Sequence, residues 1–180
     1  EFLGGEIKFE SNQELSTENL EVIERLDLNQ TKMVLFASVI ASQSEMQFSS
    51  IKVVDSSYPL AGQVQLEPPF NEGIHIKQTP HKNSAWLDKR LLDLLNANLG
   101  DKISIGDADF TVTNVLVSEP DRGSNNYAFA PKAIISISDL PQTNIIQPGS
   151  RVRYAYLYTG PTGDLETLKK IFETIKGPGD

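Results

Sequence analysis

Two histidines, His75 and His81, are the residues of this 180-residue sequence best suited to act as a general base. A serine hydrolase would need such a base beside a positioned serine, but the sequence contains no Gly-x-Ser-x-Gly pattern. His75 lies between Ile74 and Ile76 in an alternating stretch that would turn it to solvent, and His81 follows a proline in a predicted loop. A lone surface imidazole is the more common case, so we assign neither histidine a catalytic role.

Three aspartates, Asp101, Asp107 and Asp109, flank one predicted hairpin and offer the oxygen ligands that calcium prefers. Their spacing lacks the internal glycine and the distal glutamate of an EF-hand loop, so we interpret them as turn-forming and solubilising residues. The chain has no cysteine, which excludes thiol catalysis, disulfides and zinc–thiolate sites. It also lacks the Gly-x-x-x-x-Gly-Lys-Ser/Thr loop that binds phosphates. The sequence therefore predicts no catalytic residue, no cofactor and no metal.

The net charge of −8 argues against nucleic acid or anionic lipid headgroups as the main partner. Binding of that kind relies on clustered lysine and arginine, whereas the basic residues here are scattered. The longest apolar run covers 33–41, which is the length of a strand and far short of the ~18 residues needed to cross a bilayer. The opening residues lack the basic region of a signal peptide, which fits a cytosolic protein and a loop of a membrane protein equally.

A polar, turn-rich loop from Glu119 to Phe129 is the best candidate for contact with a partner or substrate. Its candidate binding residues are Asp121, Arg122, Tyr127 and Phe129, because a loop tip can present aromatic side chains to a partner or a lipid. The alternative, which we favour, is a long hairpin loop with an Asp121–Arg122 charge pair and buried aromatics.

A second aromatic group, Tyr154, Tyr156 and Tyr158, falls on one face of a predicted strand. A sheet face covered by a helix is the favoured interpretation of this stripe, and a ligand groove is the alternative.

The elements that would position these residues fall into three parts. In the first part, alternation predicts a strand over 5–10, and helical spacing predicts a helix over 17–28. Two apolar strands follow over 32–41 and 46–54, with a β-bulge at Ser49-Ser50, where the alternation changes phase.

The middle part has short predicted strands over 63–66 and 74–77, then a helix over 88–98 capped by its first residue. A hairpin with strands over 102–105 and 110–117 follows.

The last part predicts strands over 132–137 and 151–158 and a helix capped by Asp164. The apolar stripe of that helix consists of Leu165, Leu168, Phe172 and Ile175.

These elements predict an α/β (α+β) fold with a discontinuous organisation. Residues 1–55 and 132–180 would form one α/β subdomain, interrupted by a small, mostly β insert of residues 56–131.

Several stretches carry a family resemblance. The pattern begins with a predicted helix that includes part of residues 85–92. It continues with a predicted hairpin over 99–107 and 110–116, in which Gly-Asp-Lys leads into the first strand and the second stretch ends in Val-Leu. This pattern is similar to the MacB-type periplasmic core domain of the MacB/FtsX-like superfamily of ABC transporter permeases. Two further stretches, 53–62 and 147–154, and the motif Glu119-Pro120-Asp121-Arg122-Gly123 resemble the lysophospholipase-associated YbbP branch of that superfamily.

The resemblance implies a periplasmic domain between the first two transmembrane helices of an inner-membrane permease. It implies a Porter-like α/β subdomain, the discontinuous part above, and a Sabre-like β insert. The domain would be non-catalytic, and a cytoplasmic ATP-binding subunit would hydrolyse ATP. The domain would transmit conformational change. It would engage either a periplasmic partner, such as a lipase or thioesterase, or a hydrophobic, lipid-related substrate. The full transporter would be a homo- or pseudo-dimer. The alternative function is a stand-alone periplasmic hydrolase or ligand-binding domain.

Overall fold

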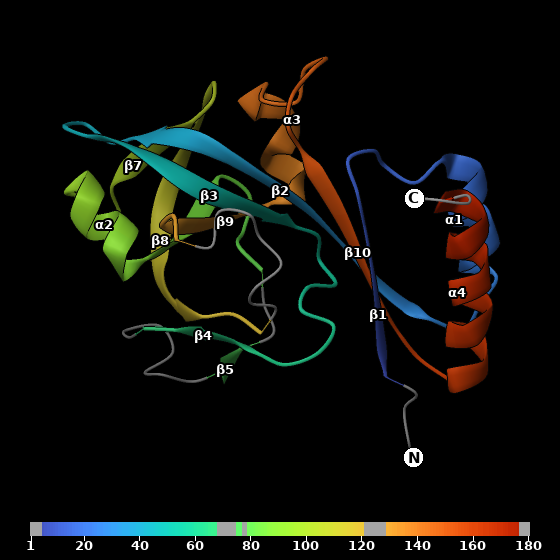
Figure 1. Ribbon diagram of the computed structural model, residues 1–180. Coiled ribbons are helices and arrows are strands. Elements are labelled where there is room, and N and C mark those ends of the chain that lie inside the picture. The colour runs from blue at the N-terminus through green and yellow to red at the C-terminus, as the bar shows by residue number, and fades with distance from the viewer. Residues whose placement is uncertain (1–4, 68–74, 77–78, 121–128, 177–180) are drawn as a thin grey trace.

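The computed structural model describes residues 5–67, 75–76, 79–120 and 129–176 of the chain. In this part of the chain, ten strands form one mixed sheet, accompanied by four α-helices and a short 3-10 helix (Figure 1). The strands are β1 (Glu6–Ser11), β2 (Asn29–Ala41), β3 (Met46–Val54), β4 (Val64–Leu66), β5 (His75–Ile76), β6 (Ser84–Asp88), β7 (Lys102–Ile105), β8 (Ala108–Ser118), β9 (Lys132–Ser136) and β10 (Arg153–Thr159). The helices are α1 (Thr17–Glu24), α2 (Lys89–Leu95), the 3-10 helix η1 (Ile137–Asp139), α3 (Leu140–Thr143) and α4 (Thr162–Lys176).

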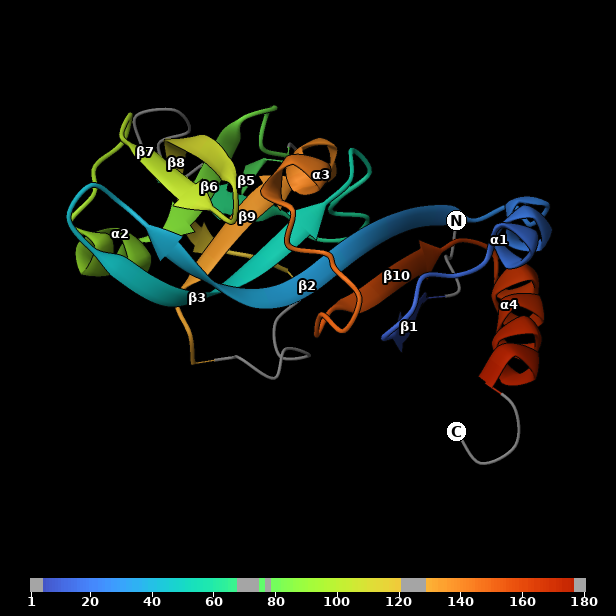
Figure 2. The same ribbon diagram turned by 90° about the horizontal axis from the view of Figure 1, so that it is seen from above.

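The sheet is continuous along the molecule, in the order β1-β10-β2-β3-β9-β6-β8-β4-β5 (Figure 2). The pairs β3–β9 and β6–β8 are parallel, and β7 adds antiparallel contacts to β2 and β8 beside this path. The predicted mixed α/β class is therefore confirmed. Strand β9 hydrogen-bonds to β3 on one side and to β6 on the other, so the sheet runs through both predicted subdomains. The boundaries of those subdomains stay a prediction.

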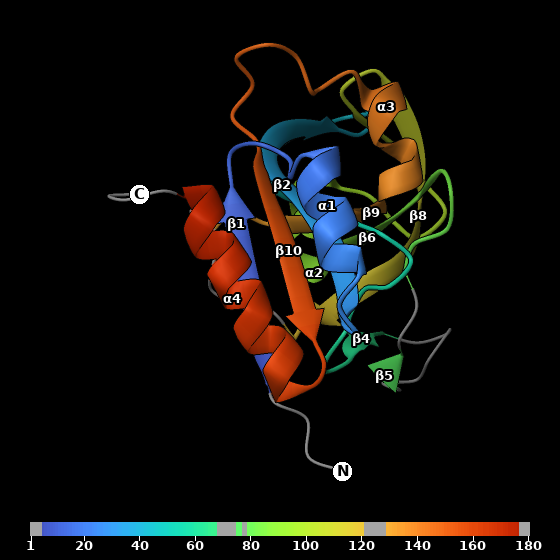
Figure 3. The ribbon, with the colours of Figure 1, turned by 90° about the vertical axis from the view of Figure 1, so that its right-hand side faces the viewer.

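Helix α4 covers one face of the sheet at the β1–β10 end (Figure 3). The Phe172 ring stacks on the Phe9 ring of β1, with centroids 4.3 Å apart, and meets the Tyr158 ring of β10 at 5.8 Å. Leu165, Leu168 and Phe172 are buried and Ile175 packs against them, which confirms the predicted apolar stripe. A second core cluster lies on the opposite face of the same strands and includes Met33, Leu35, Ala155, Leu157, Trp86 and Leu116. Apolar clusters therefore lie on both faces of the sheet.

The predicted bulge at Ser49-Ser50 is wrong. Ser49 pairs with Ser38 and Ser50 pairs with Ala37 without any shift in register. The change of phase has another cause, because the face that carries Phe48 continues through Ser50 and the buried Lys52. An ion pair inside the fold, described below, replaces the apolar side chain that simple alternation would place there.

Several helix ends also differ from the prediction. Helix α1 ends at Glu24, and α2 ends at Leu95 because Asn96 adopts the left-handed conformation that terminates helices. Helix α4 begins at Thr162, so Asp164 lies in its first turn and not at its cap. The predicted cap Asp88 is confirmed, since its carboxylate accepts a hydrogen bond from the Leu91 N–H at 2.8 Å. Among the described residues, no helix is long and apolar enough to cross a membrane.

Phe172→Ala should destabilise the domain by about 3 kcal/mol, because it removes the stack on Phe9 and leaves a cavity between α4 and the sheet. Urea denaturation followed by circular dichroism would measure this change in the free energy of unfolding. Glu173→Ala, at the exposed neighbouring position of α4, should cost less than about 0.5 kcal/mol. Equal losses in the two variants would contradict the role given to the stripe.

Candidate functional site

The residues considered for catalysis or metal binding are not brought together. His81 is exposed in a turn, where its carbonyl oxygen accepts hydrogen bonds from Ser84, and the His75 side chain lies outside the described residues. The Asp101 carboxylate accepts a hydrogen bond from the Asn98 N–H, and Asp107 accepts one from the Asn144 amide, as turn residues do. Within the part of the chain described, no three His, Asp or Glu side chains are placed to hold a metal ion.

A buried ion cluster is the most unusual polar feature of the fold. The Lys52 ammonium lies 2.5 Å from the Glu119 carboxylate, and the Lys132 ammonium lies 3.3 Å from the same oxygen. The Lys52 and Glu119 side chains are only 10% and 5% exposed. The Lys52 ammonium also lies 3.4 Å from the Tyr58 hydroxyl and 5.4 Å from the centre of its ring. Charges buried this deeply are tolerated only when they are paired, so these side chains fix one another in place.

A partly buried carboxylate, that of Asp88, connects β9, which carries Lys132, to helix α2. This carboxylate accepts hydrogen bonds from the backbone N–H of Leu91 at the start of α2 and from that of Lys132 in β9. Burial raises the pKa of Asp88, although these two N–H groups favour the charged form. One sign of the cluster is visible in the sequence, the phase change in β3, but Glu119, which pairs with Lys52, lies 67 residues away.

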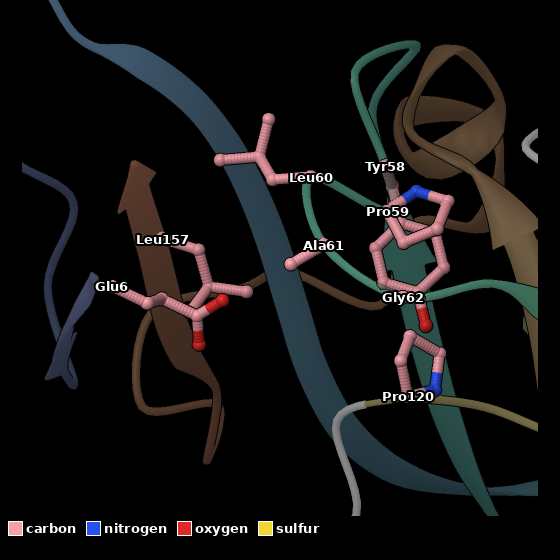
Figure 4. A pocket seen from close by; sticks show the side chains of 8 residues that line it. All are labelled: Glu6, Tyr58, Pro59, Leu60, Ala61, Gly62, Pro120 and Leu157. Carbon is pink, nitrogen blue, oxygen red and sulfur yellow. The ribbon is translucent and has the colours of Figure 1, made fainter. Parts of the chain in front are cut away.

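A small pocket lies beside this cluster, with a volume of about 180 Å³. Figure 4 shows the segment from Tyr58 to Gly62 beside Pro120, across the pocket from Glu6 and Leu157. Gly62 has a φ of 75°, and a Cβ atom there would come within 2.6 Å of the Pro120 Cβ. Only glycine allows this close approach. The structure thus brings the stretch 53–62 together with Pro120, which belongs to the described part of the Glu119-Pro120-Asp121-Arg122-Gly123 motif; both stretches carry the resemblance to the YbbP branch.

The four predicted binding residues are only partly covered by the structure. Asp121, Arg122 and Tyr127 lie outside the described residues. Phe129 is 90% exposed, and its carbonyl oxygen accepts a hydrogen bond from the Arg90 guanidinium at 2.5 Å. The favoured interpretation of this loop, with buried aromatics, is therefore wrong for Phe129.

The tyrosine stripe is a covered sheet face at all three of its positions. The Tyr158 hydroxyl donates to the Gln30 side chain at 2.8 Å, and the Tyr156 hydroxyl accepts from the Leu15 N–H at 3.1 Å. Both rings are buried, which confirms the favoured interpretation for them. Tyr154 is also buried, at 8% exposed, which confirms the same interpretation, and it lines a second cavity as well.

Comparison with known sequences gives the relationship. No protein-family model matches this chain. The ABC transporter permease YbbP of Escherichia coli strain K12 is 32% identical to it over 170 residues, which are 94% of this chain. The chain is a homologue of a segment of an ABC transporter permease. It spans about one fifth of the length of that relative, since the match covers 20% of YbbP.

Solved structures show the same fold in this YbbP-like domain. The extracellular domain of the noncanonic ABC-type transporter YknZ from Gram-positive bacteria superposes with a TM-score of 0.58 at 11% identity, over 85% of this chain and 77% of that one. A domain of a permease protein from Porphyromonas gingivalis superposes with a TM-score of 0.53 at 16% identity, over 87% and 68% of the two chains. At these identities the likeness concerns the fold alone.

Glu119→Gln should destabilise the YbbP-like domain by about 3 kcal/mol, because it removes a buried carboxylate that pairs with the buried Lys52 ammonium. The free energy of unfolding in urea would measure the loss. Asp93→Asn removes an exposed pair with Lys89, whose side chains are both 68% exposed, and should cost less than about 0.5 kcal/mol. A Glu119→Gln variant as stable as Asp93→Asn would show that the buried cluster contributes nothing to stability.

Proposed function

We propose that this chain is the extracytoplasmic domain of an ABC transporter permease, and that it passes conformational change from the membrane to a periplasmic partner or a hydrophobic substrate without catalysing a reaction. One observation carries the proposal: the homology to YbbP covers 94% of the chain. The shared fold with the extracellular domain of YknZ supports the same side of the membrane. A cytoplasmic ATP-binding subunit would drive the movement through transmembrane helices.

The continuous sheet supports the mechanical part of the proposal. Hydrogen-bonded strands link β1 at one end to β5 at the other, so a displacement of the β1–α4 end is carried along the sheet. The buried Lys52–Glu119 pair holds Glu119, the residue before Pro120, against β3. Movement of the sheet would therefore reach Glu119 and Pro120, which precede the proposed partner surface in the chain.

The partner surface that we propose comprises Asp121, Arg122, Tyr127 and Phe129. The support is the 90% exposure of Phe129, since exposed aromatic side chains are favoured contact residues in interfaces. This proposal includes a lipase- or thioesterase-type partner, a lipid-related substrate and a homo- or pseudo-dimer. It also includes the division into Porter-like and Sabre-like subdomains. The rival function, a hydrolase, gains no support from His81, which lies exposed in a turn.

The location is tested with a cysteine placed at the exposed Glu166 of α4 in the full-length permease, after any native cysteines have been replaced. We expect a maleimide that cannot cross the inner membrane to label Glu166→Cys in cells with a permeabilised outer membrane. Labelling only after the inner membrane is lysed would place the domain in the cytoplasm and overturn the proposal.

The partner surface is tested by photo-crosslinking in cells, with the crosslinker at Ala130 of the full-length permease. Phe129→Asp should weaken partner binding about 30-fold, because a central aromatic contact contributes about 2 kcal/mol or more. Val22→Asp changes an apolar residue that is 41% exposed on α1 and should leave the crosslinked fraction unchanged. Equal crosslinking of Phe129→Asp and the unchanged protein would show that Phe129 is not a contact residue.

A further inference from the structure

A groove with a volume of about 310 Å³ lies on the α4 side of the sheet, between the segment that leads into α1 and the short helix α3. This volume is at the lower end of the range that small-molecule sites occupy. The face of β2 and β10 that forms its floor is the one covered elsewhere by α1 and α4 (Figure 3). The groove therefore lies on this sheet face beside the part that the helices cover.

Most of the groove is apolar. Its floor is the buried Val34 of β2 and the Tyr154 ring of β10, which lie opposite each other in the sheet. Its wall consists of Ile137, Leu140 and Ile146, and the last of these is 39% exposed. An apolar ligand body placed here would cover side chains that now face water.

One end of the groove carries a positive charge that is held in place. The Lys32 ammonium lies 5.5 Å from the centre of the Tyr154 ring and 5.9 Å from that of Tyr156, within the range of cation–π attraction. Its carboxylate partner is Glu14, at 2.5 Å. The Lys32 side chain is 23% exposed, whereas that of Glu14 is 57% exposed. An exposed ion pair contributes at most about 1 kcal/mol, so another anion can replace Glu14 at small cost.

The Tyr154 hydroxyl is available at the same end. The hydroxyls of Tyr156 and Tyr158 are both hydrogen-bonded inside the fold, but that of Tyr154 has no such partner among the residues described. Burial, and then the charge of Glu14, raise the pKa of Tyr154, so its hydroxyl stays protonated and can donate a hydrogen bond. A protonated donor beside an ammonium is suited to a carboxylate.

We propose that this groove binds a small amphipathic anion of the medium-chain carboxylate class. The ligand carboxylate takes the place of Glu14 on the Lys32 ammonium and accepts a hydrogen bond from the Tyr154 hydroxyl. The alkyl chain lies against Ile137, Leu140 and Ile146. The groove volume of about 310 Å³ has room for an alkyl chain of medium length. The inference concerns the domain itself and does not depend on the proposed transport function.

The test is titration of the 180-residue chain with decanoate, below the concentration at which decanoate forms micelles, followed by calorimetry and by NMR. We expect saturable binding with a dissociation constant on the order of 0.1 mM, a normal affinity for a ligand of this size. Decanol, which lacks the charge, and decyltrimethylammonium, which has the opposite charge, should each bind at least about tenfold more weakly.

Three variants separate the parts of the proposed site. Lys32→Gln should weaken decanoate binding about tenfold and leave decanol binding unchanged. Tyr154→Phe should weaken decanoate binding by a similar factor, because one hydrogen bond to the charged carboxylate is lost. Glu14→Gln should strengthen decanoate binding several-fold, because the competing carboxylate is gone. Lys89→Gln, a change at an exposed lysine of α2, should alter nothing. A thermal melt of each variant checks that it is folded.

Absence of saturable decanoate binding would overturn the proposal. Decanol binding as tight as that of decanoate would show an apolar groove without an anion site. Binding by Lys32→Gln or Glu14→Gln equal to that of the unchanged protein would show that the ligand head does not meet the Lys32–Glu14 end.

Discussion

The pairing of Lys52 with Glu119 is the constraint around which the middle of this domain is organised. Lys52 belongs to β3, Glu119 follows β8, and Lys132, which shares the carboxylate, opens β9. Charges so deeply buried must stay paired, because an isolated one would cost several kcal/mol. The pair therefore requires β3, the end of β8 and the start of β9 to meet, and the Tyr58–Gly62 segment closes over the same place.

This meeting point explains how the chain can leave the first sheet strands and return to them. Strand β9 enters between β3 and β6, parallel to β3, and completes a sheet with apolar cores on both faces. In a permease domain this sheet would carry motion from the β1–α4 end toward the exposed Phe129, so the buried pair links the stability of the fold to its proposed use.

The tyrosines of β10 show how one structural pattern can serve two purposes. Tyr156 and Tyr158 have their hydroxyls satisfied within the fold and act as core residues. Tyr154 continues the same face to the edge of the groove beside α3, and there its ring lies 5.5 Å from the Lys32 ammonium. Strand periodicity places all three rings on one face, but the reach of the covering helices decides which of them can bind a ligand.

The sequence by itself determined the elements whose signals are local. The apolar stripe of α4, the bounds of β3, the cap Asp88 and the β7–β8 hairpin all follow from the spacing of nearby residues. Tertiary structure decided what depends on distant residues. The phase change in β3 is caused by the buried pair with Glu119, 67 positions away, and not by a bulge. The short helix α3 is held by Asp139, whose carboxylate accepts a hydrogen bond from the Asn83 N–H. The exposure of Phe129 and the open groove at Tyr154 were likewise beyond the reach of periodicity. Periodicity reports which side of an element is apolar, whereas the packing of other elements determines whether that side is covered.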